Sequence, residues 1–348
     1  NMPATSIRDL VIKDNDLVVG THGRSFWILD DITSLRQLSK ELSSQQTILY
    51  KPADAFRVRW NTYPDTPMPA EEPAGENPPD GAIIDYWLKE KIADEVILDI
   101  LDASGKIVRH YSSRDTMYKI PDVNIPLYWI RPQQILSVEE GAHCFVWDLH
   151  YQPLNVPPTY PISAVNENTA PDPTSPWVMP GVYSAQLQVN GKSYSESFSI
   201  KMDPRVKTSN ASLQQQHDLS LQCYEDRKQV LVALNEINHL QSQLEKIIPS
   251  ATGGLKKSLL QLQQQLASLE AAAAGSKNEN FNSLNDELAT VFSTLQNNDM
   301  PPTTQCIESA HETHLAFERL WQKWTAQKDD LNKINKQLKG KSLQVPGY

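Results

Sequence analysis

The sequence lacks a long hydrophobic run and an excess of basic residues. No apolar run approaches the roughly 18 residues that a membrane-spanning helix needs. The formal net charge is −10, with 42 acidic against 32 basic residues, which argues against a nucleic-acid partner because phosphates favour a basic surface. The hydrophobic content of 39% fits a globular protein, and 348 residues are enough for two or three domains.

The sequence also lacks a regular cysteine or histidine pattern. Its three cysteines, Cys144, Cys223 and Cys306, have no CxxC spacing and leave one thiol over in any pairing. A Cys223–Cys306 bridge between helices and buried free thiols are both open. The two histidines of the segment His311 to His314 are three positions apart, whereas a zinc-protease helix needs four. We therefore expect His314 to be a packed residue, and we expect no metal and no cofactor.

Strand and turn signals open the chain. Leu17 to Val19 and Phe26 to Leu29 are apolar runs separated by a glycine-containing turn, which predicts a β-hairpin, and Ile7 to Ile12 predicts a third strand. Three strands that open a chain need a further partner, because so small a sheet is marginally stable in water. The sequence therefore predicts that this chain is the C-terminal piece of a longer protein.

The turn and the strand after it carry a family resemblance. Gly20-Thr21-His22-Gly23-Arg24, followed by Phe26-Trp27-Ile28-Leu29-Asp30-Asp31, resembles the closing blade of secreted β-propellers of the sortilin-like, BNR (Asp-box) repeat group, many of which are called glycosyl hydrolases. No complete Asp box occurs in this sequence. The resemblance implies a secreted bacterial protein, extracellular or periplasmic, with the upstream propeller as the partner of this chain.

Two roles are open for the turn itself. His22 and Arg24 could reach the central channel of the propeller and bind an anionic or sugar substrate. Alternatively, Gly20 and Gly23 form the tight turn and Arg24 pairs with an acidic neighbour.

A proline-rich acidic segment from Tyr63 to Pro79 predicts a linker, and strands follow it. Short apolar segments with turn signals between them predict an immunoglobulin-like or fibronectin-like β-sandwich, with Trp147 in its core. The predicted strands are Ala82 to Leu88, Glu95 to Leu101, Ile107 to Tyr111, Ala142 to Leu149, Gly181 to Asn190 and Lys192 to Met202.

Aromatic residues in the predicted loops suggest a third role. Trp129, Trp177 and neighbouring tyrosines could stack on sugar rings, as in a carbohydrate-binding module. The alternative is that Trp177 covers the edge of the sandwich, or that exposed rings mark a protein interface.

Beyond Ser209 the apolar spacing alternates between four and three, which predicts helices. The expected lengths are about 35 to 40 residues for the first and fourth helices and about 20 for the second and third. Up-down connectivity would then place the two short helices against one half of the long pair. The sequence predicts an antiparallel four-helix bundle, with a two-helix stalk from Leu213 to Arg227 and from Leu331 to Leu338. The bundle could dock a partner or fold back on the sandwich.

Glycoside hydrolysis needs a pair of carboxylates. The candidate pairs are Asp30 with Asp31, Asp99 with Asp102, and Glu139 with Glu140. Asp30 and Asp31 are predicted to end a strand and cap a helix near Thr33, Asp102 to form a turn, and Asp99 to be exposed. We therefore assign no catalytic residue.

The predicted fold class is multidomain β plus α. The predicted divisions are a propeller-blade remnant and connector at 1–50, a Pro-rich linker at 51–80, an immunoglobulin-like sandwich at 81–205, an antiparallel helical bundle at 206–340 and a tail at 341–348. The predicted function is a non-catalytic accessory or interaction region. A glycoside hydrolase whose active site this region completes, and a carbohydrate-binding module, are the alternatives.

Overall fold

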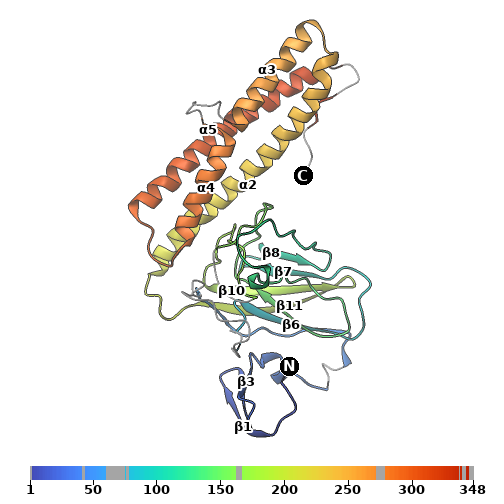
Figure 1. Ribbon diagram of the computed structural model, residues 1–348, viewed down its shortest axis with the longest axis vertical. Coiled ribbons are helices and arrows are strands. Elements are labelled where there is room, and N and C mark those ends of the chain that lie inside the picture. Colours follow the sequence, from blue (N-terminus) through green and yellow to red (C-terminus); the bar gives the residue numbers. More distant parts are fainter. Residues whose placement is uncertain are drawn as a thin grey trace. The chain divides into compact units, whose positions relative to one another are not determined.

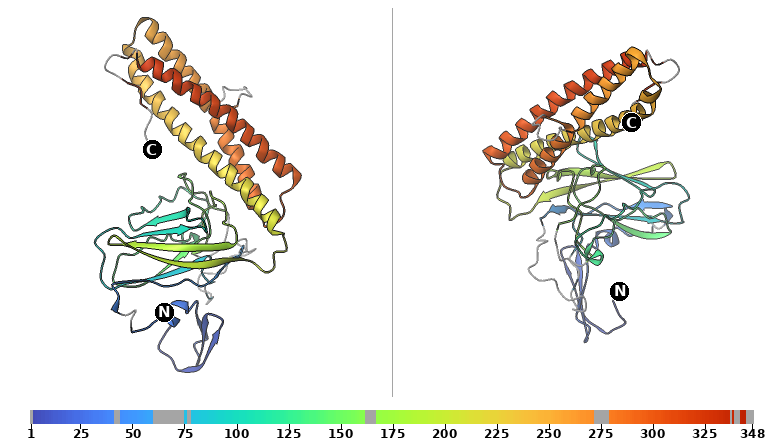
Figure 2. Two further views of the ribbon diagram at one scale, coloured as in Figure 1. Left: turned by 180° about the vertical axis from the view of Figure 1, so that it is seen from behind. Right: turned by 45° about the horizontal axis from the view of Figure 1, so that its top comes forward.

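The computed structural model is a mixed α+β structure with three N-terminal β-sheets and a C-terminal bundle of four helices (Figures 1 and 2). It describes residues 2–40, 44–59, 75, 78–161, 167–271, 279–336, 338 and 342–344. The chain forms two compact units, Asn1–Lys207 and Thr208–Tyr348. This order of sheets and then helices confirms the coarse prediction from the sequence.

The first sheet is an antiparallel meander of β1 (Ile7–Lys13), β2 (Asp16–Thr21) and β3 (Phe26–Leu29). Its strands and turns lie where the hairpin signals predict them. A one-turn helix, α1 (Thr33–Arg36), follows. The sequence from Ser34 to Leu42 predicts a short helix, whereas α1 ends at Arg36.

Two further sheets, which together we call the two-sheet unit, share one hydrophobic core. This core includes Ile84, Leu98, Trp147 and Leu187. The five-stranded sheet has the order β5-β11-β10-β7-β8 and the three-stranded sheet the order β4-β6-β9. The strands are β4 (Thr47–Leu49), β5 (Ala55–Arg57), β6 (Ala82–Leu88), β7 (Ile97–Leu101), β8 (Ile107–Ser112), β9 (Gly141–Trp147), β10 (Gly181–Val189) and β11 (Lys192–Met202).

Alternating apolar residues explain how these sheets close over their core. In β6 every second residue from Ala82 is buried, and β10 buries alternate residues from Tyr183, as expected for sheets with one covered face. Trp147 is fully buried and lies 5.5 Å from the ring of Tyr183 and 6.2 Å from that of Phe198, so its predicted core position is confirmed. Gly81 has φ of +145°, and a Cβ there would lie 2.1 Å from the carbonyl oxygen of Trp147, so only glycine fits at the start of β6.

The segment predicted as a linker contributes a strand that the sequence did not reveal. Ala55–Arg57 forms β5, which pairs in parallel with β11 at the edge of the five-stranded sheet. Residues 60–74 and 76–77 of the predicted linker lie outside the described residues.

The second unit contains α2 (Asn210–Ile247), α3 (Gly253–Glu270), α4 (Phe281–Gln296) and α5 (Thr304–Asn335). Two short 3₁₀ helices complete the described elements of the chain, Leu127–Trp129 in the first unit and Ile248–Ser250 after α2. Ser209, Asn280 and Thr303 each accept a backbone N–H three residues later and so cap α2, α4 and α5. None of the described helices has a stretch long and apolar enough to cross a membrane.

The predicted up-down connectivity of the four helices is wrong. Nδ1 of His314 lies 2.8 Å from Oδ2 of Asp226, and Nε1 of Trp324 lies 3.1 Å from Oε2 of Glu236; both pairs are 88 positions apart. This constant offset makes α2 and α5 parallel. Figure 1 shows α3 and α4 one after the other along that pair, rather than side by side as a hairpin.

The predicted two-helix stalk is also wrong for the segment Leu213 to Arg227, because α4 covers this first half of α2. Nε2 of Gln216 donates to the carbonyl oxygens of Leu295 and Asn298 at 2.7 Å, and Gln296 donates to Ser220 at 2.7 Å. Gln216 thereby satisfies carbonyl groups at the end of α4. The stalk was predicted from a scarcity of large apolar residues, and this polar packing carries no such signal.

The pairing of α2 with α5 gives a direct test. Glu236 is 5% exposed, and its Oε2 lies 2.6 Å from Nζ of Lys328. Lys328→Met leaves this buried carboxylate without its cation, so we expect about 2 kcal/mol less stability in urea unfolding. Adding Glu236→Gln should recover most of that loss. Lys333→Met, which removes an exposed pair with Asp330, should change stability by less than about 0.5 kcal/mol; equal losses in both single variants would contradict the assigned pairing.

Candidate functional site

His22 and Arg24 lie in the exposed turn between β2 and β3. The turn is held by its backbone: the His22 N–H donates to the Ser6 carbonyl at 2.9 Å, and Nε1 of Trp27 donates to the Arg24 carbonyl at 2.8 Å. Gly23 has φ of +75°, which favours glycine. Among the described residues Arg24 has no carboxylate partner, so the expected ion pair of Arg24 is not found there.

Trp129 and Trp177 occupy different environments. Trp129 ends the 3₁₀ helix Leu127–Trp129, is half-buried and meets the exposed ring of Tyr128 edge to face. Trp177 is only 9% exposed, so its ring offers no open face to a sugar. The alternative that Trp177 covers part of the sandwich matches this burial.

Trp177 is the centre of a group of cationic and aromatic side chains, which we call the Trp177 cluster: Arg57, Arg59, Arg109, His150 and Trp177. The ring of His150 lies 4.3 Å from the indole of Trp177, and the guanidinium carbons of Arg57 and Arg59 lie 5.6 Å and 5.4 Å from it. These distances suit cation–π contacts. Arg57 is buried and donates to the carbonyl of Val178.

Positive charge outweighs negative charge in and around the Trp177 cluster. Nη1 of Arg109 donates to the carbonyl of Tyr151 at 2.9 Å, while its Nη2 lies 4.0 Å from Oδ2 of Asp148. Burial lowers the pKa of His150, and the nearby Arg109 and Arg59 lower it further against the opposing effect of Asp148. His150 is therefore neutral at pH 7. Its side chain is 12% exposed, and its Nε2 has no hydrogen-bond partner among the described residues.

Of these residues, only Trp177 was predicted from the sequence as a candidate binding residue. Arg57 and Arg59 alternate in an extended segment, and so share one face, but the proline-rich surroundings favoured a linker. Arg109 lies in β8, whereas His150 forms an isolated bridge with Trp177 outside the named strands, and the two residues meet only in the folded chain. The cluster joins segments that are far apart in sequence and fixes one end of the two-sheet unit.

Carboxylates of the three candidate pairs form local hydrogen bonds and ion pairs. Oδ1 of Asp31 accepts the N–H of Thr33 at 3.0 Å, and Oδ1 of Asp102 accepts the N–H groups of Ser104 and Lys106. Glu139 pairs with Lys91 at 2.6 Å. The expectation that Asp99 is exposed is wrong.

Asp99 is 4% exposed because two neighbouring strands supply its partners. Its Oδ1 lies 2.6 Å from Nδ1 of His110, and its Oδ2 accepts from Gln188 at 3.1 Å. Cross-strand pairing, which single-strand alternation does not reveal, satisfies this buried carboxylate.

His314 packs on the ring of Phe317, with centroids 6.2 Å apart, and it pairs with the buried Asp226. Its side chain remains 30% exposed. Within the described ranges, no three His, Cys, Asp or Glu side chains form a group that could hold a metal ion. All three cysteines are free, and burial raises the pKa of Cys223 to about 12.

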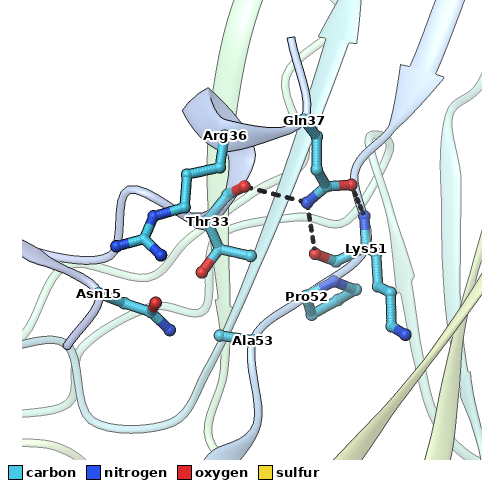
Figure 3. Close-up of a pocket in the computed structure, with 7 residues that line it drawn as sticks. All are labelled: Asn15, Thr33, Arg36, Gln37, Lys51, Pro52 and Ala53. Carbon is cyan, nitrogen blue, oxygen red and sulfur yellow. Dashed lines mark hydrogen bonds between the residues drawn. The ribbon is translucent and has the colours of Figure 1, made fainter.

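A pocket with a cavity volume of about 340 Å³ lies apart from these residues. It is bounded by the β1–β2 turn, α1 and the segment Lys51 to Ala53 (Figure 3). Gln37 joins two of these walls, because its Nε2 donates to the carbonyls of Thr33 and Lys51 while its Oε1 accepts the N–H of Lys51.

Comparison of the chain with family models, curated proteins and solved structures finds no match. The functional interpretation therefore depends on residues and geometry.

The lowered pKa of His150 predicts a pH dependence. Because the folded protein holds His150 neutral, its contribution to stability is fully present above the unfolded pKa of about 6.5 and is lost as the pH falls below that value. We expect His150→Gln, which cannot become charged, to lose less stability than wild type between about pH 6.5 and pH 5. Thermal unfolding at each pH measures this. The control His311→Gln changes an exposed histidine and should follow wild type; parallel curves for His150→Gln and wild type would refute the assignment.

Proposed function

We propose that this chain is a non-catalytic C-terminal accessory region of a secreted propeller protein of the sortilin-like, BNR repeat kind. In this proposal the β1–β3 sheet is the remnant of a propeller blade, covered on both faces by neighbouring sheets of the same polypeptide. The two-sheet unit that follows is an immunoglobulin-like or fibronectin-like sandwich, and the helical unit completes the accessory region. The protein would work outside the cytoplasm, in the periplasm or the extracellular space.

The observation that carries this proposal is that both faces of the β1–β3 sheet carry exposed apolar side chains. Residues directly opposite one another in an antiparallel sheet share a face. The strand register sets the side chains of each face. One face, called face A, carries Leu10, Ile12, Leu17, Val19, Trp27 and Leu29. The other, called face B, carries Val11, Val18, Phe26 and Ile28, with the charged residues Asp9, Lys13 and Asp16 at its ends.

These faces are largely uncovered. Leu10 and Ile12 on face A are 53% and 55% exposed, and Phe26 and Ile28 on face B are 77% and 59% exposed. An antiparallel sheet with one wet side normally alternates apolar with polar residues. Two apolar faces are instead typical of a sheet that forms a middle layer, and exposed patches of this kind mark interaction surfaces.

The size of each face favours a partner in the same polypeptide. Three strands about 4.8 Å apart and about 23 Å long present roughly 300 Å² on each side. A stable complex between separate proteins buries about 800 Å² on each partner, so neither face alone would hold a freely diffusing partner or a second copy. A tethered neighbour needs less area because the linkage raises its effective concentration. Radially packed blades of a propeller supply two such neighbours.

Lysine substitutions on each face test this proposal. In the isolated chain 1–348, Leu10→Lys on face A and Ile28→Lys on face B should leave stability within about 0.5 kcal/mol, because both side chains are solvent-exposed. In the polypeptide purified from its source, each should cost about 2 kcal/mol or more, because the lysine would be buried without a partner.

Leu315→Lys on α5 is the matched control, since Leu315 is 50% exposed and lies outside the sheet. It should be neutral in both proteins. If the two face variants are as neutral in the source polypeptide as in the isolated chain, the sheet has no covering partner and the proposal fails.

A further inference from the structure

The pocket beside α1 brings hydrogen-bond donors together opposite an apolar wall. Figure 3 shows the side chains of Asn15, Thr33 and Arg36 gathered at one side of it, while the ammonium group of Lys51 points away from them. Pro52 and Ala53 form the apolar wall opposite. We propose that this pocket binds a small ligand with a carboxylate group and a compact apolar body.

Arg36 supplies the charge that this ligand needs. Its Nη2 donates to the carbonyl oxygen of Asp14 at 2.8 Å, which fixes the guanidinium beside the β1–β2 turn. A guanidinium has five N–H donors in a planar fork, so this one bond leaves donors for a carboxylate. The lining contains no acidic side chain, because Asn15, Gln37 and Thr33 are neutral and Arg36 and Lys51 are cationic.

Thr33 supplies a second, independent indication of a ligand. Its Oγ1 atom is buried and has no hydrogen-bond partner among the described residues. A buried hydroxyl without a partner costs about 1 to 3 kcal/mol. A carboxylate oxygen in the pocket would accept a hydrogen bond from this hydroxyl. The backbone around Thr33 is fixed, since its N–H donates to Asp31 and its carbonyl accepts from Gln37.

The size and rigidity of the pocket suit a small molecule. A cavity of about 340 Å³ lies at the lower end of the range that ligand pockets span, about 300 to 1,000 Å³. Two hydrogen bonds of 2.9 Å join Gln37 to Lys51, and a third of 3.1 Å joins it to Thr33 of α1, so the walls are set before a ligand arrives. This proposal is independent of the two faces of the β1–β3 sheet.

Benzoate is a suitable probe, because it has a carboxylate on a flat apolar ring. Its neutral control is benzamide, which has the same shape. In calorimetric titration of chain 1–348 we expect saturable binding of benzoate and at least about tenfold weaker binding of benzamide, since a charge-assisted bond to Arg36 is lost. Equal binding of the two probes, or no saturable binding of benzoate, would overturn the proposal.

Two variants locate the binding. Arg36→Gln should weaken benzoate binding by about tenfold or more and leave benzamide unchanged, because it removes the charge. Thr33→Val keeps the side-chain shape, removes the hydroxyl and should weaken benzoate severalfold without lowering the melting temperature. Arg114→Gln is the control for charge alone, since Arg114 is exposed and pairs with Glu95 elsewhere. If Arg36→Gln binds benzoate as wild type does, the assigned pocket is wrong.

Discussion

Burial of apolar faces is the constraint on which the rest of this structure depends. The five-stranded sheet and the β4-β6-β9 sheet cover each other's apolar faces around Trp147, and the long helices bury theirs against α3 and α4. The β1–β3 sheet departs from this rule, because exposed apolar side chains lie on both of its faces, with Leu10 and Ile12 on face A and Phe26 and Ile28 on face B. Since uncovered apolar area is costly in water, this departure supports our proposal that the sheet needs a partner and that the chain works through association.

Polar groups inside the two units decide how the elements are arranged. Asp226 and Glu236 on α2 meet His314 and Trp324 on α5 at one constant offset, which sets the two long helices parallel and in one register. In the two-sheet unit the Trp177 cluster plays a comparable part. Arg57 bonds to Val178, which is 121 positions away, and so connects β5 to the segment that leads into β10. Such contacts specify a single arrangement where apolar packing alone would allow several.

These polar contacts also explain what the sequence could predict and what it could not. Apolar alternation and turn residues located β1 to β3 and the strands around Trp147, and heptad spacing located all four helices. The place of α4 beside the first half of α2 was missed because Gln216 and Ser220 pack α2 against α4 without an apolar signal. The burial of Asp99 and the grouping of Arg109 with His150 depend on neighbouring strands. No pattern along a single segment contains that information.

We propose that the β1–β3 sheet is a middle layer within a longer polypeptide. The intact mass and N-terminal sequence of the protein purified from its source test this claim most directly. We predict a much larger product, in which repeated sheet-forming segments precede Ile7. A product that begins at or near Met2 would contradict the claim, because no polypeptide would then be present to cover the two apolar faces.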